Sequence, residues 1–172
     1  MSDGSRPVAG STREASSFWP DAWKVVESEL RARRGGFAAI DMSTTAAQHT
    51  LGLLSDVVSA VVSVGERFAE YEAPPSVEMV IGRLNDTTLL TNIEVLFTRE
   101  MDVDVVSLLR QLGRRVPLVV AWPGRIAAGR LCHSVPGRSD YVDVPVDGAL
   151  ILRPVLTQFP DETPYVVERT LV

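Results

Sequence analysis

Apolar positions along the chain alternate between the spacing of helices and that of buried strands. Helical spacing predicts helices over 20–34, from 46 onward, over 76–84 and from 102 or 104 to 113. Short continuous apolar runs predict buried strands over 37–40, 89–97 and 116–122. Because helices and apolar strands alternate, we expect an α/β protein with a mostly parallel sheet flanked by helices.

One element boundary stays open at this level. Thr50 and Leu54 continue the helical face that begins near Ala46. The stretch 61–64 is rich in β-branched residues and is followed by Gly65, which is typical of a strand. A longer helix and a helix followed by a strand both fit this pattern.

The two ends of the chain differ in character from its middle. Residues 1–16 are small and polar without periodicity, which predicts a disordered leader. Residues 17–172 are expected to form a single domain. From about residue 126, short strands are predicted over 129–135, 149–152 and 165–167, joined by Pro, Gly and Asp turns. We expect this β-rich tail to form an appendage at the edge of the sheet.

The first junction between a strand and a helix, at 39–51, has the length of a phosphate-binding loop. Ser43 stands at the position of the first glycine of such a loop, Gln48 at the second and His49 at the lysine. Only Thr50 keeps its residue type. Losing glycine restricts the backbone that surrounds a phosphate, and losing lysine removes a permanent positive charge. The junction is either a degenerate nucleotide site or an ordinary connection.

The second junction follows the strand that begins at residue 89. A nucleotide hydrolase needs an aspartate at the end of such a strand to hold Mg²⁺. Thr91 stands at that place and Glu94 lies three residues further on, so tight Mg²⁺ binding is not expected. These polar residues are either remnants of a nucleotide site or side chains that face solvent.

Composition and charge exclude several classes of protein. The 172 residues include 17 basic and 22 acidic ones, and the net charge of −5 argues against a protein whose main task is to hold duplex DNA. Lys24 is the only lysine, so no intact phosphate loop exists. A single cysteine, Cys132, excludes a Cys-based zinc site, and two histidines, His49 and His133, leave few ligands for a metal centre. Without a membrane span or signal sequence, we expect a cytoplasmic protein.

Three sequence blocks in the middle of the chain resemble a known family. The blocks are Asn92-Ile-Glu-Val-Leu-Phe97, Leu118-Val-Val-Ala-Trp-Pro-Gly-Arg125 and Gly129-Arg-Leu-Cys-His-Ser-Val-Pro-Gly-Arg138. They resemble the small P-loop proteins of bacterial phage-exclusion (BREX-type) defence islands, over residues 36–145. The resemblance implies a P-loop-like architecture and partners among phage-defence proteins. That family has an intact phosphate loop and an aspartate before the Asn-Ile-Glu block, and this chain departs from it at both places, so the ATPase activity is not carried over.

Two further groups of residues are candidates for intermolecular contacts. Trp19 and Trp23 share one face of the first predicted helix, where they either anchor a partner or pack in the interior. A candidate anion- or nucleic-acid-binding patch consists of Arg114, Arg115, Arg125 and Arg130. The alternative for these arginines is a solvated surface or ion pairing with acidic neighbours.

Taken together, these features predict a non-catalytic component, an adaptor or regulator, of a multiprotein phage-defence system. Its expected partners are other proteins of that system, with a homo-oligomer as an open alternative. DNA is expected to be contacted only weakly or indirectly, and no contact with a membrane is expected. No catalytic residue, metal or cofactor is assigned. The alternative is a nucleotide-binding ATPase or switch that holds ATP through His49 and Thr50.

Overall fold

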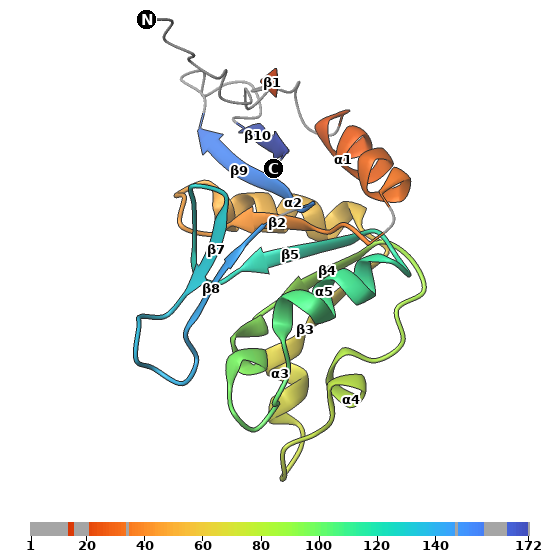
Figure 1. Cartoon of the computed structure of the whole chain (residues 1–172). Helices are drawn as coiled ribbons and strands as arrows, with labels where there is room; N and C mark the ends of the chain where they lie inside the picture. The colour runs from red at the N-terminus through yellow and green to blue at the C-terminus, as the bar shows by residue number, and fades with distance from the viewer. Residues whose placement is uncertain (1–13, 16–20, 34, 147, 157–164, 172) are drawn as a thin grey trace, which may run out of the picture.

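The computed structural model of the chain describes residues 14–15, 21–33, 35–146, 148–156 and 165–171. These residues form a large sheet with helices on both faces and a second, smaller sheet (Figure 1). Within these ranges no helix is both long enough and apolar enough to cross a membrane.

The elements follow one another in a mixed order along the chain. The helices are α1 (Asp21–Ala32), α2 (Ala47–Val57), α3 (Val64–Ala69), α4 (Val77–Ile81), the 3₁₀ helix η1 (Ile93–Phe97) and α5 (Val105–Gly113). The strands are β1 (Glu14–Ala15), β2 (Ala38–Asp41), β3 (Ala60–Ser63), β4 (Thr88–Thr91), β5 (Leu118–Trp122), β6 (Arg125–Ala127), β7 (Arg130–His133), β8 (Val142–Pro145), β9 (Leu150–Leu156) and β10 (Tyr165–Leu171).

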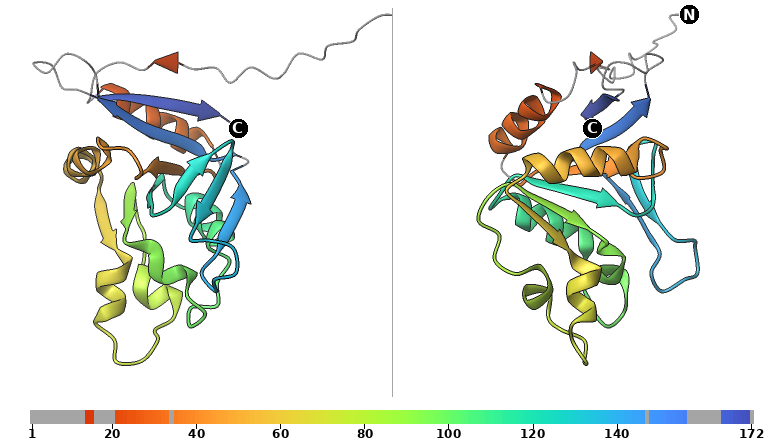
Figure 2. Two further views of the ribbon diagram at one scale, coloured as in Figure 1. Left: turned by 90° about the vertical axis from the view of Figure 1, so that its left-hand side faces the viewer. Right: turned by 180° about the vertical axis from the view of Figure 1, so that it is seen from behind.

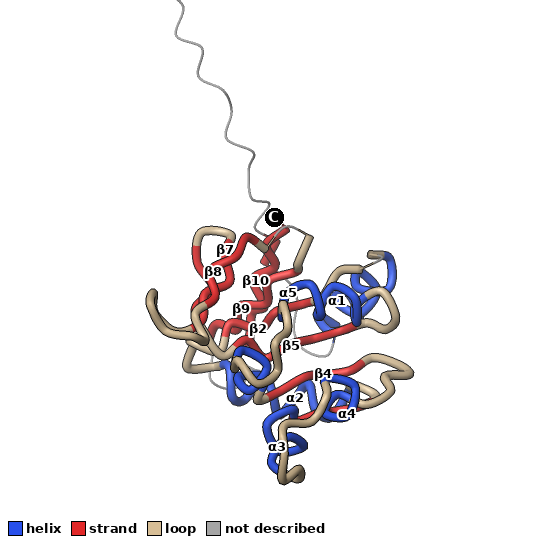
Figure 3. The backbone as a smooth tube through the Cα atoms, turned by 60° about the horizontal axis from the view of Figure 1, so that its bottom comes forward, coloured by secondary structure: helices blue, strands red, loops and turns tan. Residues whose placement is uncertain are grey.

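Five parallel strands form the centre of the large sheet, in the order β9-β2-β5-β4-β3. Figure 3 shows β9, β2, β5 and β4 as neighbours. Ala38 of β2 pairs with both Val119 of β5 and Leu150 of β9, so β2 lies between these two strands. Every residue of β2 and β5 is buried, as expected for parallel strands covered on both faces. The predicted α/β class with a mostly parallel sheet is confirmed.

The two faces of the sheet are covered by different elements. Helices α1 and α2 cover one face, where Trp23, Leu30 and Leu54 pack with Ile40 of β2. Helix α5 covers the other face, where Leu109 belongs to a cluster that also includes residues of η1 and β7. Figures 1 and 2 show α2 and α5 on opposite sides of the sheet. The core therefore has two layers, separated by the strands themselves.

The predicted strand over 89–97 is wrong in its second half. β4 ends at Thr91, because Asn92 adopts a left-handed backbone conformation with φ of 50°. Asparagine tolerates this conformation better than most residues, and its side-chain amide donates a hydrogen bond of 2.8 Å to Ser63 Oγ at the end of β3. Residues 93–97 then form η1, so the apolar run is buried as one side of a short helix.

The open boundary after α2 is resolved as a helix followed by a strand. α2 ends at Val57, Val58 is extended with ψ of 154°, and residues 60–63 pair in parallel with β4. β3 is the edge strand of the sheet, and Val61 on it is 44% exposed. The β-branched composition of this stretch outweighed its helical spacing.

The β-rich tail is divided between the two sheets. β6, β7 and β8 form the smaller antiparallel sheet, which matches the predicted appendage. β9 instead pairs in parallel with β2, and β10 pairs antiparallel with β9, so this part of the tail completes the large sheet. Of the predicted leader, only residues 14 and 15 are described, and they pair with β10 as β1.

Candidate functional site

The carboxyl edge of the parallel strands is the first place to look for a site, because ligands of open α/β sheets usually bind there. Asp41 ends β2 at this edge and Thr91 ends β4. Ser43 and Thr50 follow Asp41 in the loop and helix after β2. Arg153 lies on β9, the neighbour of β2.

Asp41 is a buried carboxylate with a full set of partners. Its Oδ1 accepts hydrogen bonds from the backbone N–H of Ser43 at 3.1 Å and from Ser43 Oγ at 2.5 Å. Its Oδ2 accepts one from Arg153 Nε at 3.0 Å. The Asp41 side chain is 4% exposed and that of Arg153 is 39% exposed. Charge-assisted bonds of this kind hold the end of β2 against the loop and against β9.

Arg153 also ties the small sheet to the large one. Its second guanidinium nitrogen donates a hydrogen bond of 3.1 Å to the carbonyl oxygen of Ile126 in β6. One side chain therefore links β9, β2 and β6. Neither Asp41 nor Arg153 was among the residues predicted for this site. The position of Asp41 directly after a buried strand was a usable signal, whereas nothing local in the sequence places Arg153 beside it.

The loop after β2 lacks the backbone geometry of a phosphate cradle. Such a cradle alternates right- and left-handed residues so that successive N–H groups converge on an anion. No residue in the described loop 42–46 has a positive φ. The backbone N–H of Ser43 in this loop is directed at the Asp41 carboxylate. The spacing of the junction is that of a phosphate loop, but its conformation is not.

The residues predicted for the nucleotide site are only partly brought together. Ser43 contacts Asp41, whereas the Thr50 hydroxyl is buried and donates to the Ala46 carbonyl of its own helix at 3.0 Å. The exposed members of the set are Ser43 in the loop, Gln48 and His49 on the first turn of α2 and Glu94 on η1. Thr91 is half-buried at the end of β4. The two predicted halves of the site lie at the ends of β2 and β4, and β5 separates these two strands in the sheet.

The blocks that carry the family resemblance meet in the core. Phe97 packs edge-on against Trp122, with ring centroids 5.4 Å apart, and stacks on His133 at 4.3 Å. Trp122 Nε1 donates a hydrogen bond of 3.0 Å to the Cys132 carbonyl oxygen. A Cβ at Gly124 would lie 1.8 Å from the same oxygen, so only glycine fits there. These conspicuous residues have a packing role, joining η1, β5 and β7.

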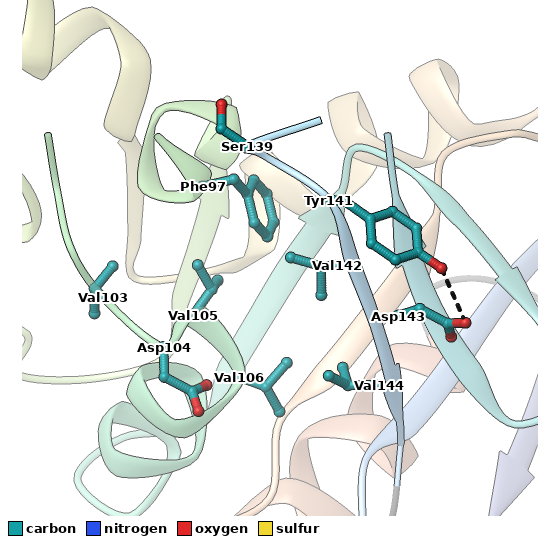
Figure 4. Close-up of a pocket in the computed structure, with 10 residues that line it drawn as sticks. All are labelled: Phe97, Val103, Asp104, Val105, Val106, Ser139, Tyr141, Val142, Asp143 and Val144. Carbon is teal, nitrogen blue, oxygen red and sulfur yellow. Dashed lines mark hydrogen bonds between the residues drawn. The ribbon is translucent and has the colours of Figure 1, made fainter. Parts of the chain in front are cut away.

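A cleft of about 460 Å³ opens between η1, the start of α5 and β8 (Figure 4). Half of the residues that line it are valines, and its polar members are Asp104, Ser139, Tyr141 and Asp143. Asp104 accepts a hydrogen bond of 2.9 Å from the backbone N–H of Ser107 and so caps α5. Burial, together with the Asp143 carboxylate, raises the pKa of Tyr141, whose hydroxyl donates to Asp143 at 3.3 Å. Both carboxylates are engaged within the protein.

The four arginines of the predicted anion-binding patch do not form one surface. Arg114 and Arg115 follow α5 and precede β5, whereas Arg125 and Arg130 lie beyond the other end of β5. At about 3.3 Å per residue, the length of that strand separates the two pairs. Arg130 Nε also donates to Asp143 at 2.6 Å, which raises the pKa of the arginine and lowers that of the aspartate. The two pairs of arginines therefore lie at opposite ends of β5.

The interface predicted on the first helix depends on whether its tryptophans are exposed. Trp23 is 4% exposed and packs in the core with residues of β2 and β9. This burial favours the interior alternative for Trp23 and removes the support for a role as an interface anchor. Trp19 lies outside the described residues.

Comparison with known proteins adds no identification. No protein-family model, no curated protein and no solved structure matches the chain. Among the described residues, no group of three or more His, Cys, Asp or Glu side chains lies close enough to hold a metal ion. Function is therefore inferred from the residues and their geometry.

Proposed function

We propose that this chain is a non-catalytic component, an adaptor or regulator, of a multiprotein bacterial phage-defence system, built on a degenerate P-loop-like domain. Two observations support the P-loop-like part. Counted along the chain, the five parallel strands lie in the order 5-1-4-3-2, so the sheet is doubly wound, with helices on both faces. The loop with phosphate-loop spacing follows strand 1 of this series, at the carboxyl edge. The resemblance of the three sequence blocks supports the phage-defence part.

The proposal that the protein is non-catalytic rests on the hydrogen bonds that the Asp41 carboxylate already accepts. A nucleotide phosphate brought to the loop after β2 would have to displace the carboxylate from the Ser43 N–H, and it would be repelled by that carboxylate. Thr91 offers no charge to hold Mg²⁺, and the Thr50 hydroxyl is already bonded to Ala46. The groups that transfer a phosphoryl group in P-loop enzymes are therefore lacking or engaged elsewhere.

The proposed role then depends on surfaces rather than on a reaction. Other proteins of the same defence system are the proposed partners, and a second copy of the chain is the alternative. Because Trp23 is buried, the partner is expected on a surface other than the apolar stripe of α1. DNA is proposed to be contacted only weakly or within a larger complex.

Phage plating on cells that carry the complete defence system tests this proposal. Deleting the gene for this chain is expected to restore plating, and complementation with the unchanged gene is expected to abolish it again. A gene carrying His49→Ala and Thr50→Ala is expected to protect as well as the unchanged one. If deletion does not affect protection, the defence role is wrong. If only the double substitution fails to protect although the protein is folded, the nucleotide-dependent alternative is correct.

A nucleotide titration separates the same alternatives in vitro. Binding at 100 times Kd would stabilise the protein by about 2.7 kcal/mol, and we expect no rise in melting temperature with millimolar ATP and Mg²⁺. Ser55→Ala is the matched control for Thr50→Ala, because Ser55 Oγ donates to the carbonyl four residues earlier on the same helix, at 2.8 Å. A shift that Thr50→Ala abolishes and Ser55→Ala preserves would support the nucleotide switch.

A further inference from the structure

Several arginines meet at the amino edge of the large sheet, opposite the edge that carries Asp41. The end of α1 and the end of α5 border a cleft of about 230 Å³ that is lined by Arg31, Arg33, Arg114 and Arg115. A neighbouring cleft of about 380 Å³ shares Arg115 and adds Arg83. We call these two adjoining hollows the arginine cleft. Val116, which precedes β5, lines both hollows.

Close backbone packing brings the two helix ends together. A Cβ at Gly113, the last residue of α5, would lie 2.3 Å from the carbonyl oxygen of Gly36 in the turn after α1, so only glycine allows this approach. Arg114 lies against the same turn, because a Cβ at Gly35 would be 3.0 Å from Arg114 Cγ. Gly35 has φ of 89°, a conformation that glycine adopts readily. The fold therefore fixes the position of both arginine-bearing segments.

The arginines of the cleft differ in their partners. Arg31 is held by Glu27 at 2.8 Å and by Asp86 at 3.0 Å. Within the described part of the chain, Arg33, Arg114 and Arg115 form no hydrogen bond or ion pair through their guanidinium groups, and neither does Arg83. In a chain with a net charge of −5, four cations without an acidic partner are concentrated at one edge.

We propose that the arginine cleft binds a ligand that presents neighbouring phosphate groups. Guanidinium groups match the geometry of phosphate and bind it through paired hydrogen bonds. Because the two hollows share Arg115, phosphates bound in both would be neighbouring groups of one ligand molecule. Among the described residues no aromatic side chain lines either hollow to stack on a base, so the ligand is recognised through its phosphates. The source of the phosphates is either a nucleic-acid backbone or a free polyphosphate.

The test uses the full chain and two probes, inorganic tripolyphosphate followed by calorimetry and a short labelled DNA duplex followed by fluorescence anisotropy. The cleft variant carries Arg114→Gln and Arg115→Gln. The control variant carries Arg99→Gln and Arg125→Gln, two exposed arginines outside the cleft, so the net charge changes equally. Arg33→Gln changes the cleft residue that follows α1. It serves as an independent variant if the substitutions at Arg114 and Arg115 disturb folding.

We expect the unchanged protein and the control variant to bind the probes at low salt. The affinity of the cleft variant should be lower by about tenfold or more. Duplex binding by the cleft variant should also show a salt dependence whose logarithmic slope is smaller by about two, one for each lost phosphate contact. Binding of both probes, or of the duplex alone, assigns the site to a nucleic-acid backbone; binding of tripolyphosphate alone assigns it to a free polyphosphate. The proposal is overturned if neither probe binds, or if cleft and control variants weaken binding equally.

Discussion

The two edges of the same sheet differ in whether their charged side chains are buried and paired or exposed and unpaired. At the carboxyl edge, Asp41 is buried and each of its oxygens accepts a hydrogen bond from Ser43 or Arg153. At the amino edge, Arg114 and Arg115 are exposed and have no acidic partner in the described structure. The edge at which α/β proteins usually bind ligands is thus closed by internal contacts, and the available charge lies at the other edge. The charge of Asp41 stabilises the fold, whereas the charges of Arg114 and Arg115 have no acidic partner among the described residues.

The largest effect on stability is expected from Trp23→Ala. This substitution removes the core side chain of α1, the helix that leads to the arginine cleft. The expected loss is about 3–5 kcal/mol in the free energy of unfolding, because Trp23 is 4% exposed. Chemical denaturation followed by circular dichroism measures it. Val25→Ala, on the exposed side of α1, is the control and should change stability little. Equal stability of the two variants would mean that α1 does not depend on this packing.

Arg153→Met tests the closed carboxyl edge. It leaves the Asp41 carboxylate buried without its cation, and we expect a loss of about 3 kcal/mol, the low end of the usual range because Arg153 is 39% exposed. Arg138→Met is the matched control, since Arg138 Nε also lies 3.0 Å from a carboxylate, that of Asp140, but is 66% exposed. The control should cost less than about 1 kcal/mol.

A second substitution sharpens the same prediction. Asp41→Asn in the Arg153→Met background removes the uncompensated charge, and it should recover part of the lost stability. If Arg153→Met and Arg138→Met have equal effects, the ion pair at Asp41 contributes no more than an exposed one. In that case the contrast between the two sheet edges would not hold.

A smaller effect is expected at the paired part of the amino edge, where Asp86 binds Arg31. The backbone N–H of Thr87 at 2.7 Å, and then the Arg31 guanidinium, hold the pKa of Asp86 below its usual value. A lowered carboxyl pKa in the folded state gives stability that is present above the ordinary carboxyl pKa and is lost as the pH falls through the lowered value.

The comparison of the unchanged protein with Asp86→Asn by urea denaturation across acid pH measures this contribution. The difference in unfolding free energy should be constant at neutral pH and should shrink as the pH falls below the ordinary range of aspartate. A difference that grows in acid would contradict the direction of the pKa shift. This outcome would also remove Asp86 as the partner that distinguishes Arg31 from the other arginines.

The smallest effect on stability is expected from Arg114→Gln with Arg115→Gln. Both side chains are exposed, so the free energy of unfolding should change by no more than about 0.5 kcal/mol. Thermal and chemical denaturation of this variant beside the Arg99→Gln, Arg125→Gln control would measure it. A loss of several kcal/mol would mean that these arginines belong to the structure of the helix ends rather than to an open binding surface.

Local patterns were sufficient for elements whose signals lie within a few residues. Asp104 caps α5 and Gly113 ends it, in agreement with the apolar stripe between them. Ser76 caps α4 by accepting from the backbone N–H of Met79. The continuous apolar run 116–122 contains β5 in full. In each case the signal lies within the element or directly beside it.

Pairings between distant parts of the chain could not be predicted. Arg153 meets Asp41 only because β9 lies beside β2, and no local signal distinguishes a strand that joins the large sheet from one that joins the small sheet. The same limit hid the arginine cleft, since Arg33 and Arg114 follow two helices, α1 and α5, that cover opposite faces of the sheet. Asn92 is a different case: one residue in a left-handed conformation turned an apolar run from strand to helix.

The central position of β2 also affects how the chain folds during synthesis. Its two neighbours are β5 and β9, so Ala38 finds its partners only when Val119 and Leu150 have been made. At about 5–20 residues per second, the ribosome takes on the order of 10 s to extend from the first of these strands to the last. During that time the apolar strand β2 is exposed without its pairing partners. Such distant contacts make folding slow, and they prolong the time during which the nascent strand is exposed to aggregation.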